Sequence, residues 1–496
     1  MWRPAHRRRT AVYHRAVRTL ASAVIALGFL AAPPIVQAQV DPDPLVAPVV
    51  FHWRQWQTPW PTLEGGSIAD GSVAFWRRQI KLLESAGFTG QLFQVSAGDE
   101  PSQRNHLAAL RERRLARPDG PLPPRVVPFF AAETFPDYLV PKDVLSREGF
   151  ERFYQAIRSF FLMYAEVFPA KPGQKGPCDT ELLATVDGRV FIALWWVPLQ
   201  SYQLPSDFFV SLSDRLARDF GFKAYWSVHE WLARGGPDDV HFLFNGPTRA
   251  EWGRNPAHPA ADLLVAFWPP NLDGYTRELF AARDGGAPYG ASWDAVIAAR
   301  PRPSIVLVES YNEITEGSHL MPSWPAAHAP GDGHWSGPPD QAHCAAQACH
   351  PVAFTDAWGL ENPWHYLDIS LRKIREWLNG PPPAGVDEVA PHALILAPRA
   401  DEVVSGATPV KVVAADDRAL REVRLYIDGW LALTSAGSID RRLKSSGLGD
   451  GRHVLRAEAV DQAGNVDVDV SEFVVRNATP SDARESGAAP GTGPRR

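Results

Sequence analysis

Eight short apolar runs constrain the fold of this chain more than any other feature of its sequence. The runs are mostly continuous rather than alternating, which is typical of strands buried on both faces of a parallel sheet. They cover residues 49–53, 90–96, 125–130, 190–196, 223–228, 239–244, 262–267 and 304–310. Segments with apolar residues at helical spacing lie among them, at 72–87, 147–168, 205–221 and 362–380.

This alternation predicts an α/β fold, specifically a (β/α)8 TIM barrel over residues 45–379. The alternative is a doubly wound open sheet. No glycine-rich phosphate loop follows the first apolar run, which argues against the nucleotide-binding versions of that alternative. The sequence therefore gives no reason to expect a cofactor.

Residues 1–38 have the pattern of an export signal. A strongly positive start precedes an apolar stretch, and Val36 and Ala38 supply the small residues of a cleavage site. Pro33 and Pro34 interrupt the stretch, which is shorter than the roughly 20 apolar residues that a membrane span needs. We expect cleavage after Ala38 and a secreted or periplasmic protein without a membrane span.

The composition changes after the last segment with helical spacing. Residues 380–390 form a linker rich in proline and glycine. Residues 391–476 contain short strand-like runs and turn signals without a helical pattern, which predicts a small all-β sandwich. Residues 477–496 are rich in Ser, Gly, Pro and Arg, and we expect them to be disordered.

The sandwich segment resembles bacterial immunoglobulin-like modules. The "VDG" hairpin of those modules is nearly met at residues 427–429, and their "GxHxLxAxAxDxAGN" pattern at residues 451–465. The resemblance implies an immunoglobulin-like domain that is a candidate for contact with a glycan or a cell surface, or a spacer. The formal net charge is −6 and no basic stripe with interleaved aromatics is present, so nucleic acid is not an expected partner.

The stretch VESYNEITEGSHL, residues 308–320, places Glu313 and Glu316 just past the eighth apolar run, with Asn312 and His319 beside them. Active sites of barrels lie where strands end. Two carboxyl groups in one pocket can divide acid and base roles, because their surroundings and mutual repulsion separate their pKa values. Cleavage of a glycosidic bond uses such a pair. By spacing alone, E-x-x-E is common and usually marks a solvated helix face. Its place at a strand end, with Asn, Gly and His beside it, makes catalysis and a polar loop equal alternatives.

Residues 310–317, SYNEITEG, resemble the "WNEWxEG" segment of glycoside hydrolase family 99 and related bacterial domains of unknown function. Residues 75–88 and 284–294 resemble other segments of the same group, and the second of these contains Tyr289. The resemblance covers roughly residues 48–379 and implies a barrel that hydrolyses glycosidic bonds.

The resemblance also implies separate roles for the two glutamates. Glu313 would deprotonate the substrate's 2-hydroxyl, which leads to an anhydrosugar intermediate, and Glu316 would act as acid and then base. Tyr311 and Ile314 replace tryptophans of the family pattern, and Thr315 takes a position often held by histidine. The family's preference for mannose is therefore not carried over.

Other polar and aromatic residues follow the expected strands. Glu133 and His229 come after the third and fifth apolar runs and are candidates to bind sugar hydroxyls, although most charged loop residues are only solvated. Trp268 and Tyr275 are candidate sugar-stacking rings, although such rings more often fill cores. The complete predicted substrate-binding set is Asn312, His319, Glu133, His229, Trp268, Tyr275 and Tyr289.

A loop rich in His and Cys follows the glutamate motif at residues 328–350. Its spacing matches no standard zinc site, so we expect no metal there and a disulfide between Cys344 and Cys349 in an oxidising compartment. Cys178 is then a free thiol. A metal-dependent hydrolase built on this loop stays open as an alternative.

A secreted glycoside hydrolase acting on a poly- or oligosaccharide is the function that these features favour. The principal alternative is a non-catalytic carbohydrate-binding surface protein on a degenerate barrel, which the replaced aromatic residues of the motif would suit. Both functions make a carbohydrate the expected partner.

Overall fold

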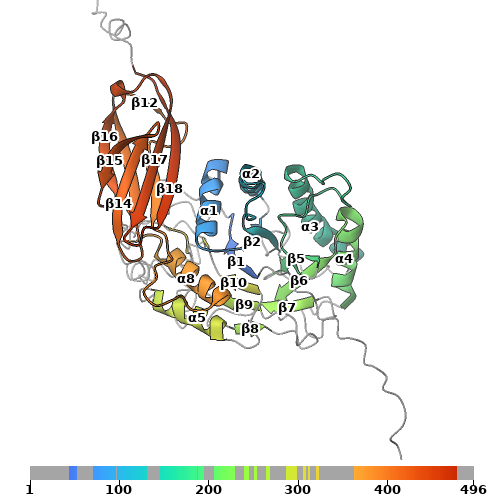
Figure 1. Ribbon diagram of the computed structural model, residues 1–496. Coiled ribbons are helices and arrows are strands. Elements are labelled where there is room, and N and C mark those ends of the chain that lie inside the picture. The colour runs from blue at the N-terminus through green and yellow to red at the C-terminus, as the bar shows by residue number, and fades with distance from the viewer. Residues whose placement is uncertain are drawn as a thin grey trace, which may run out of the picture. The chain divides into compact units, whose positions relative to one another are not determined.

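The computed structural model describes most of the two expected domains (Figure 1). The described residues are 44–52, 71–96, 98–130, 146–186, 188–194, 206–229, 240–244, 251–253, 264–267, 286–298, 305–308, 311–312, 320–322 and 362–477. The expected export signal and nearly all of the expected disordered tail lie outside them.

Eight of the described strands form a parallel sheet, in the order β9-β10-β1-β2-β3-β5-β6-β7. Two short strands, β4 (Thr185–Val186) and β8 (Glu251–Gly253), add antiparallel pairs to β5 and β9. The strands of the parallel sheet are β1 (Leu45–Val50), β2 (Gly90–Val95), β3 (Arg125–Phe130), β5 (Arg189–Leu194), β6 (Ala224–His229), β7 (Val240–Phe244), β9 (Leu264–Phe267) and β10 (Ile305–Val308).

The order of these strands agrees with the predicted α/β class and distinguishes between the two expected architectures. Neighbours in the sheet follow one another along the chain, except that the last parallel strand, β10, lies beside the first, β1; a doubly wound sheet instead reverses its order near the middle. The last strands of the path, β7 and β9, also lie against each other. Both observations agree with a closed barrel. Seven of the parallel strands coincide with predicted apolar runs, with small differences at their ends. The first differs, because β1 begins at Leu45 and shares only residues 49 and 50 with the predicted run at 49–53.

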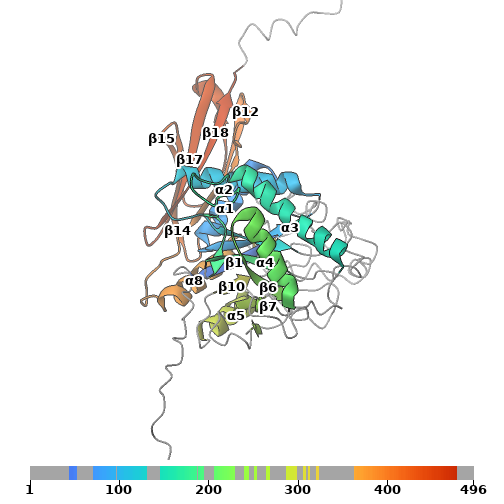
Figure 2. The ribbon, with the colours of Figure 1, turned by 90° about the vertical axis from the view of Figure 1, so that its right-hand side faces the viewer.

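Helices connect the strands and cover the outer face of the sheet (Figures 1 and 2). Those at the expected segments are α1 (Val73–Ser85), α3 (Arg147–Val167), α4 (Ser206–Phe220) and α8 (His365–Asn379). Local signals explain two of their beginnings: the Ser72 hydroxyl accepts from the Phe75 amide at 3.1 Å, and the Ser146 hydroxyl accepts from the Gly149 amide at 3.0 Å. Gly87, at φ 81°, follows α1 in a conformation that favours glycine.

Two further helices were not predicted from periodicity, α2 (Glu100–Ala116) and α5 (Ala287–Ala298). The buried face of α2 includes Ser102, Gln103 and His106. Polar residues at these positions interrupt the periodic apolar pattern by which an amphipathic helix is recognised in a sequence. The position of α2 between two strands is nevertheless a signal for a helix, because parallel neighbours such as β2 and β3 need a crossover connection, which is usually helical.

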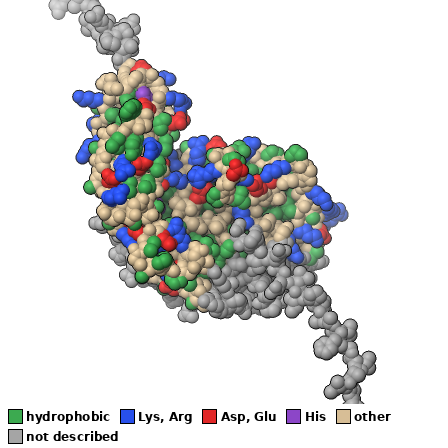
Figure 3. All heavy atoms as spheres, in the orientation of Figure 1, with side chains coloured by type: hydrophobic (Ala, Val, Ile, Leu, Met, Phe, Trp, Pro, Cys, Tyr) green, Lys and Arg blue, Asp and Glu red, His purple; other side chains and the backbone are tan. Residues whose placement is uncertain are grey.

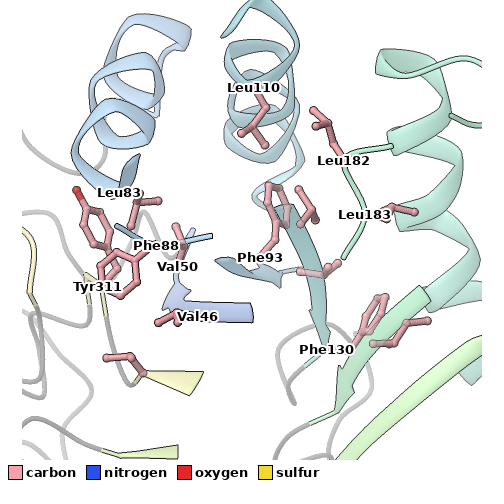
Figure 4. Close-up of a cluster of buried hydrophobic side chains, with 14 of the residues drawn as sticks. Val46, Val50, Leu83, Phe88, Phe93, Leu110, Phe130, Leu182, Leu183 and Tyr311 are labelled. Atoms are coloured by element: carbon pink, nitrogen blue, oxygen red, sulfur yellow. The ribbon is translucent and has the colours of Figure 1, made fainter. Parts of the chain in front are cut away.

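The sheet is buried on both faces. Along β1, Val46 and Val50 pack with residues of the surrounding helices, whereas Leu45, Ala47 and Val49 join a second cluster that contains no helix residue. Successive residues of a strand point to opposite faces, so the sheet packs against helices outside and against itself inside. Figure 4 shows the outer cluster between the strands and the helices.

Strands alone, apart from one 3-10 turn (Ser445–Gly447), make up the regular structure described after α8. They form two sheets, β11-β13-β16 and β12-β18-β17-β14-β15, around a shared apolar core. Their bounds are β11 (His392–Ala397), β12 (Val403–Val404), β13 (Ala407–Ala415), β14 (Leu420–Ile427), β15 (Trp430–Ser435), β16 (Ile439–Lys444), β17 (Gly451–Asp461) and β18 (Val466–Val475).

The hairpin between β14 and β15 falls on the "VDG"-like residues. Asp428 and Gly429 have φ values of 49° and 85°, and positive φ at both central positions is typical of the type I′ turn of a two-residue hairpin. Acidic and basic side chains are interspersed on the described part of the face seen in Figure 3.

Candidate active site at the ends of the strands

The chain beyond β10 stays beside β1 through two residues of the glutamate motif. The Tyr311 amide donates to the Val49 carbonyl at 2.8 Å. The Asn312 side chain then takes the place of a peptide group: its Oδ1 accepts from the Phe51 amide at 2.7 Å, and its Nδ2 donates to the Phe51 carbonyl at 2.9 Å. Asn312 is only 1% exposed. Its amide therefore fixes the backbone immediately before Glu313.

Tyr311 closes the loop that carries both glutamates. Its carbonyl accepts from the amides of Leu320 (3.0 Å) and Met321 (2.7 Å), which lie on the far side of residues 313–319. The two ends of this loop are thereby held together at the carboxyl end of β10, although residues 313–319 themselves lie outside the described part of the chain.

The Tyr311 side chain belongs to the core. It is fully buried beside Leu83 and Phe88 (Figure 4). Its hydroxyl donates to Gln79 Oε1 of α1 at 2.7 Å. At this position the tyrosine hydroxyl thus satisfies a buried acceptor of α1.

A pair of buried histidines, which the sequence did not reveal, lies at the carboxyl ends of β1 and β2. His52 Nδ1 is 2.8 Å from the Gln94 carbonyl oxygen, and His52 Nε2 is 3.0 Å from Nδ1 of His106 on α2. The His106 ring stacks on Trp76, with ring centroids 4.1 Å apart and planes inclined by 1°. No motif links these residues, because 54 positions separate the two histidines.

Burial determines the charge of this pair, and its hydrogen bonds determine the tautomers. Burial lowers the pKa of His52 to about 3, against a smaller opposing effect of the Gln94 carbonyl. It also lowers the pKa of His106 well below its usual value, with His52 adding to the effect. Both rings are neutral near pH 7. Since a carbonyl only accepts, His52 carries its proton on Nδ1, and its Nε2 accepts from His106 Nδ1.

The other predicted site residues fall in different surroundings. Tyr289, on α5, is fully buried with its hydroxyl 2.8 Å from the Ser370 hydroxyl of α8, so its observed contacts join two helices. His229 is the last residue of β6 and pairs in register with Phe244 of β7. The remaining predicted residues lie outside the described residues, and they are Glu313, Glu316, His319, Glu133, Trp268 and Tyr275, together with Cys344 and Cys349.

Cys178 is a buried free thiol, as expected. Burial, with a smaller contribution from Asp179, raises its pKa to about 11, so that it stays protonated and unreactive near neutral pH. None of the described helices combines the length and apolar character that crossing a membrane requires.

Comparison with known proteins gives distant structural likenesses only. No protein-family model matches the chain, and no curated protein matches it. The GH99 endo-alpha-mannosidase from Bacteroides thetaiotaomicron is 13% identical over 66% of this chain and 84% of its own, with a TM-score of 0.43. The endo-beta-1,4-mannanase from Thermotoga petrophila is 10% identical over 88% of this chain and 99% of its own, with a TM-score of 0.34.

A separate likeness covers a smaller share of the chain. The fibronectin(III)-like modules of Clostridium thermocellum CbhA are 18% identical over 18% of this chain and 100% of their own, with a TM-score of 0.15. At TM-scores below 0.5, none of these likenesses defines a family or an activity for the chain.

Proposed function

We propose that this chain is an exported glycoside hydrolase in which Glu313 and Glu316 cleave a glycosidic bond of a poly- or oligosaccharide. The observation that carries the proposal is the loop closed by Tyr311. It joins the two ends of residues 313–319 at the carboxyl end of a strand in a parallel sheet. This edge is where barrels place their catalytic residues.

The proposed chemistry divides the work between the two carboxyl groups. Glu313 takes the proton of the substrate's 2-hydroxyl, and that oxygen attacks the anomeric carbon. Glu316 donates its proton to the departing glycosidic oxygen, which leaves a 1,2-anhydrosugar. Glu316, now a carboxylate, then deprotonates a water that opens the anhydrosugar, and the proton on Glu313 returns to the 2-oxygen. Each carboxyl group ends the cycle as it began.

Two features of the described structure would serve this chemistry by positioning. The double hydrogen bond of Asn312 to Phe51 fixes the backbone next to Glu313. The neutral His52–His106 pair joins the residues after β1 to α2 by a buried hydrogen bond without adding charge. A catalytic pair must be held within a fraction of an ångström of its productive geometry.

Export is part of the proposal and depends on residues 1–38. The exported protein is expected to begin at Gln39. Amino-terminal sequencing of protein recovered outside the cytoplasm would test this, and an uncleaved chain retained in the cytoplasm would contradict it.

The non-catalytic alternative gains no support at Tyr311, because the replaced aromatic is a core residue with a satisfied hydroxyl. A screen of the mature chain against α- and β-linked polysaccharides, with release of reducing sugar as the readout, distinguishes the two functions. Glu316→Gln should reduce any activity found by about 10²–10⁴-fold. Glu112→Gln, at a half-exposed site on α2, is the control that should change nothing. Full activity in Glu316→Gln would rule out the assignment.

A further inference from the structure

Three aspartates converge where the linker meets the turn between β13 and β14. Asp387 comes from the linker, and Asp416 and Asp417 come from the turn. One possible ligand oxygen from each lies within 4.8 Å of the others. The side chains of Asp387 and Asp417 are 9% and 5% exposed, so two of the three carboxylates are almost fully removed from water.

Part of each carboxylate is already engaged by the protein. Asp416 Oδ2 accepts from the amides of Arg418 (2.9 Å) and Ala419 (2.6 Å). Asp417 Oδ2 pairs with the guanidinium of Arg372, on α8. Asp387 Oδ2 lies 3.6 Å from the partly exposed Arg418 guanidinium, and its Oδ1 accepts from the Val389 amide at 3.3 Å.

Two oxygens of the cluster are left over. Oδ1 of Asp416 and Oδ1 of Asp417 are buried and have no hydrogen-bond partner among the described residues. A buried carboxylate oxygen without a donor is costly, and most such atoms in native proteins have a partner. The Asp417 oxygen stands out, because the side chain that carries it is only 5% exposed.

We propose that Asp387, Asp416 and Asp417 bind a divalent cation of the calcium class. The donors are all hard oxygen atoms, which suit Ca²⁺ and Mg²⁺ rather than a transition metal. An irregular set of carboxylates completed by water suits the flexible coordination of Ca²⁺ better than the strict octahedron of Mg²⁺. The cation would supply the missing partner of both free oxygens.

A cation at this place would join the linker to the sandwich. The Asp387 carbonyl already accepts from Asn465 Nδ2 at 3.1 Å, which ties the linker to the turn after β17. The cation would add a second tie, to the turn after β13, and the free energy of binding would appear as stability of the C-terminal strands.

The test is calcium titration of the full mature chain after treatment with EDTA, by isothermal titration calorimetry and differential scanning calorimetry. We expect one site with a dissociation constant of about 10⁻⁴–10⁻³ M, the range typical of calcium sites in extracellular modules. At a calcium concentration ten times this dissociation constant, the melting temperature of the C-terminal strands should be higher by about 5 °C or more than in NaCl of equal ionic strength.

Two variants and a control make the result specific. Asp416→Asn keeps an oxygen for the Arg418 and Ala419 amides, so it should fold while losing the calcium response, and Asp417→Asn should lose it too. Asp440→Asn, at a site 75% exposed on β16, should respond like the wild-type chain. The proposal is overturned if the wild-type chain shows neither heat nor stabilisation up to 10 mM CaCl₂, roughly ten times the weakest expected constant, or if Asp416→Asn keeps the full response.

Discussion

At the scale of single residues, the buried amide of Asn312 and the buried histidines His52 and His106 hold the backbone around the ends of β1 and β10. Asn312 was predicted as a substrate ligand, but its buried amide bonds the Phe51 backbone on both sides. Amide side chains that replace a peptide group cannot be recognised in a sequence, because the partner strand is hundreds of residues away. The His52–His106 pair was missed because no motif links the two histidines, which are 54 positions apart.

The buried histidine pair predicts how stability depends on pH. Both folded-state pKa values are lowered, so the unfolded chain binds more protons below its own histidine pKa of about 6.5. The contribution is therefore complete above that pH and is lost on acidification, at about 1.4 kcal/mol per pH unit for each histidine.

His106→Gln removes one of these titrating groups. Between pH 6.5 and pH 5, the free energy of unfolding from urea denaturation should fall less steeply in the variant than in the wild-type chain, by about 1.4 kcal/mol per pH unit. Equal slopes in the two proteins would mean that His106 titrates normally in the folded state.

At the scale of elements, continuous apolar runs were the most reliable signal. Strands buried on both faces need apolar residues on both, so β2, β3 and β10 stood out in the sequence. Helices were recognised where their stripe is apolar, as in α1 and α3, and missed in α2, whose buried face carries Ser102, Gln103 and His106. The closure of the 313–319 loop depends on backbone hydrogen bonds of Tyr311, which periodicity cannot show.

The attachment of that loop to α1 can be tested with Tyr311→Phe. The substitution removes the hydroxyl that donates to Gln79 Oε1 and leaves a buried acceptor unpaired. We expect the free energy of unfolding to fall by about 1–3 kcal/mol. The matched control is Tyr426→Phe on β14, which removes a partly buried hydroxyl that donates to Glu458 of β17. It should lower the free energy of unfolding by less. If Tyr311→Phe lowered the free energy of unfolding no more than Tyr426→Phe does, the result would contradict a stabilising role for the Tyr311–Gln79 hydrogen bond.

At the scale of the whole molecule, the sequence indicated a barrel, a linker and a sandwich but not the contacts that join them. His392 of β11 lies 2.6 Å from the Asp368 carboxylate of α8 and stacks on Trp364. Lys81 of α1 donates to the Val468 carbonyl of β18 at 2.7 Å. Such contacts depend on the final placement of elements, so composition and spacing could only indicate where one fold ended and the next began.

The junction at His392 should respond to pH in the opposite sense to the barrel histidines. Burial alone would lower the pKa of His392, but the Asp368 carboxylate, helped by Asp467, outweighs burial and raises it. Stability from this pair is complete below pH of about 6.5 and is lost as pH rises through the folded-state value. His392→Gln should therefore flatten the decline of the melting temperature between pH 6.5 and pH 8.5. An identical decline in the variant would exclude the pair as its cause.

The most direct test of the central claim is the dependence of each glutamate variant on the leaving group. With a substrate found by the polysaccharide screen, Glu316→Gln and Glu313→Gln are compared on the natural glycoside and on the matching glycosyl fluoride, whose leaving group needs no proton. If Glu316 is the acid and Glu313 the base, Glu316→Gln regains much of the rate of fluoride release in single-turnover measurements, whereas Glu313→Gln stays impaired on both substrates. Equal impairment of Glu316→Gln on the two substrates, or full activity in either variant, would contradict the account.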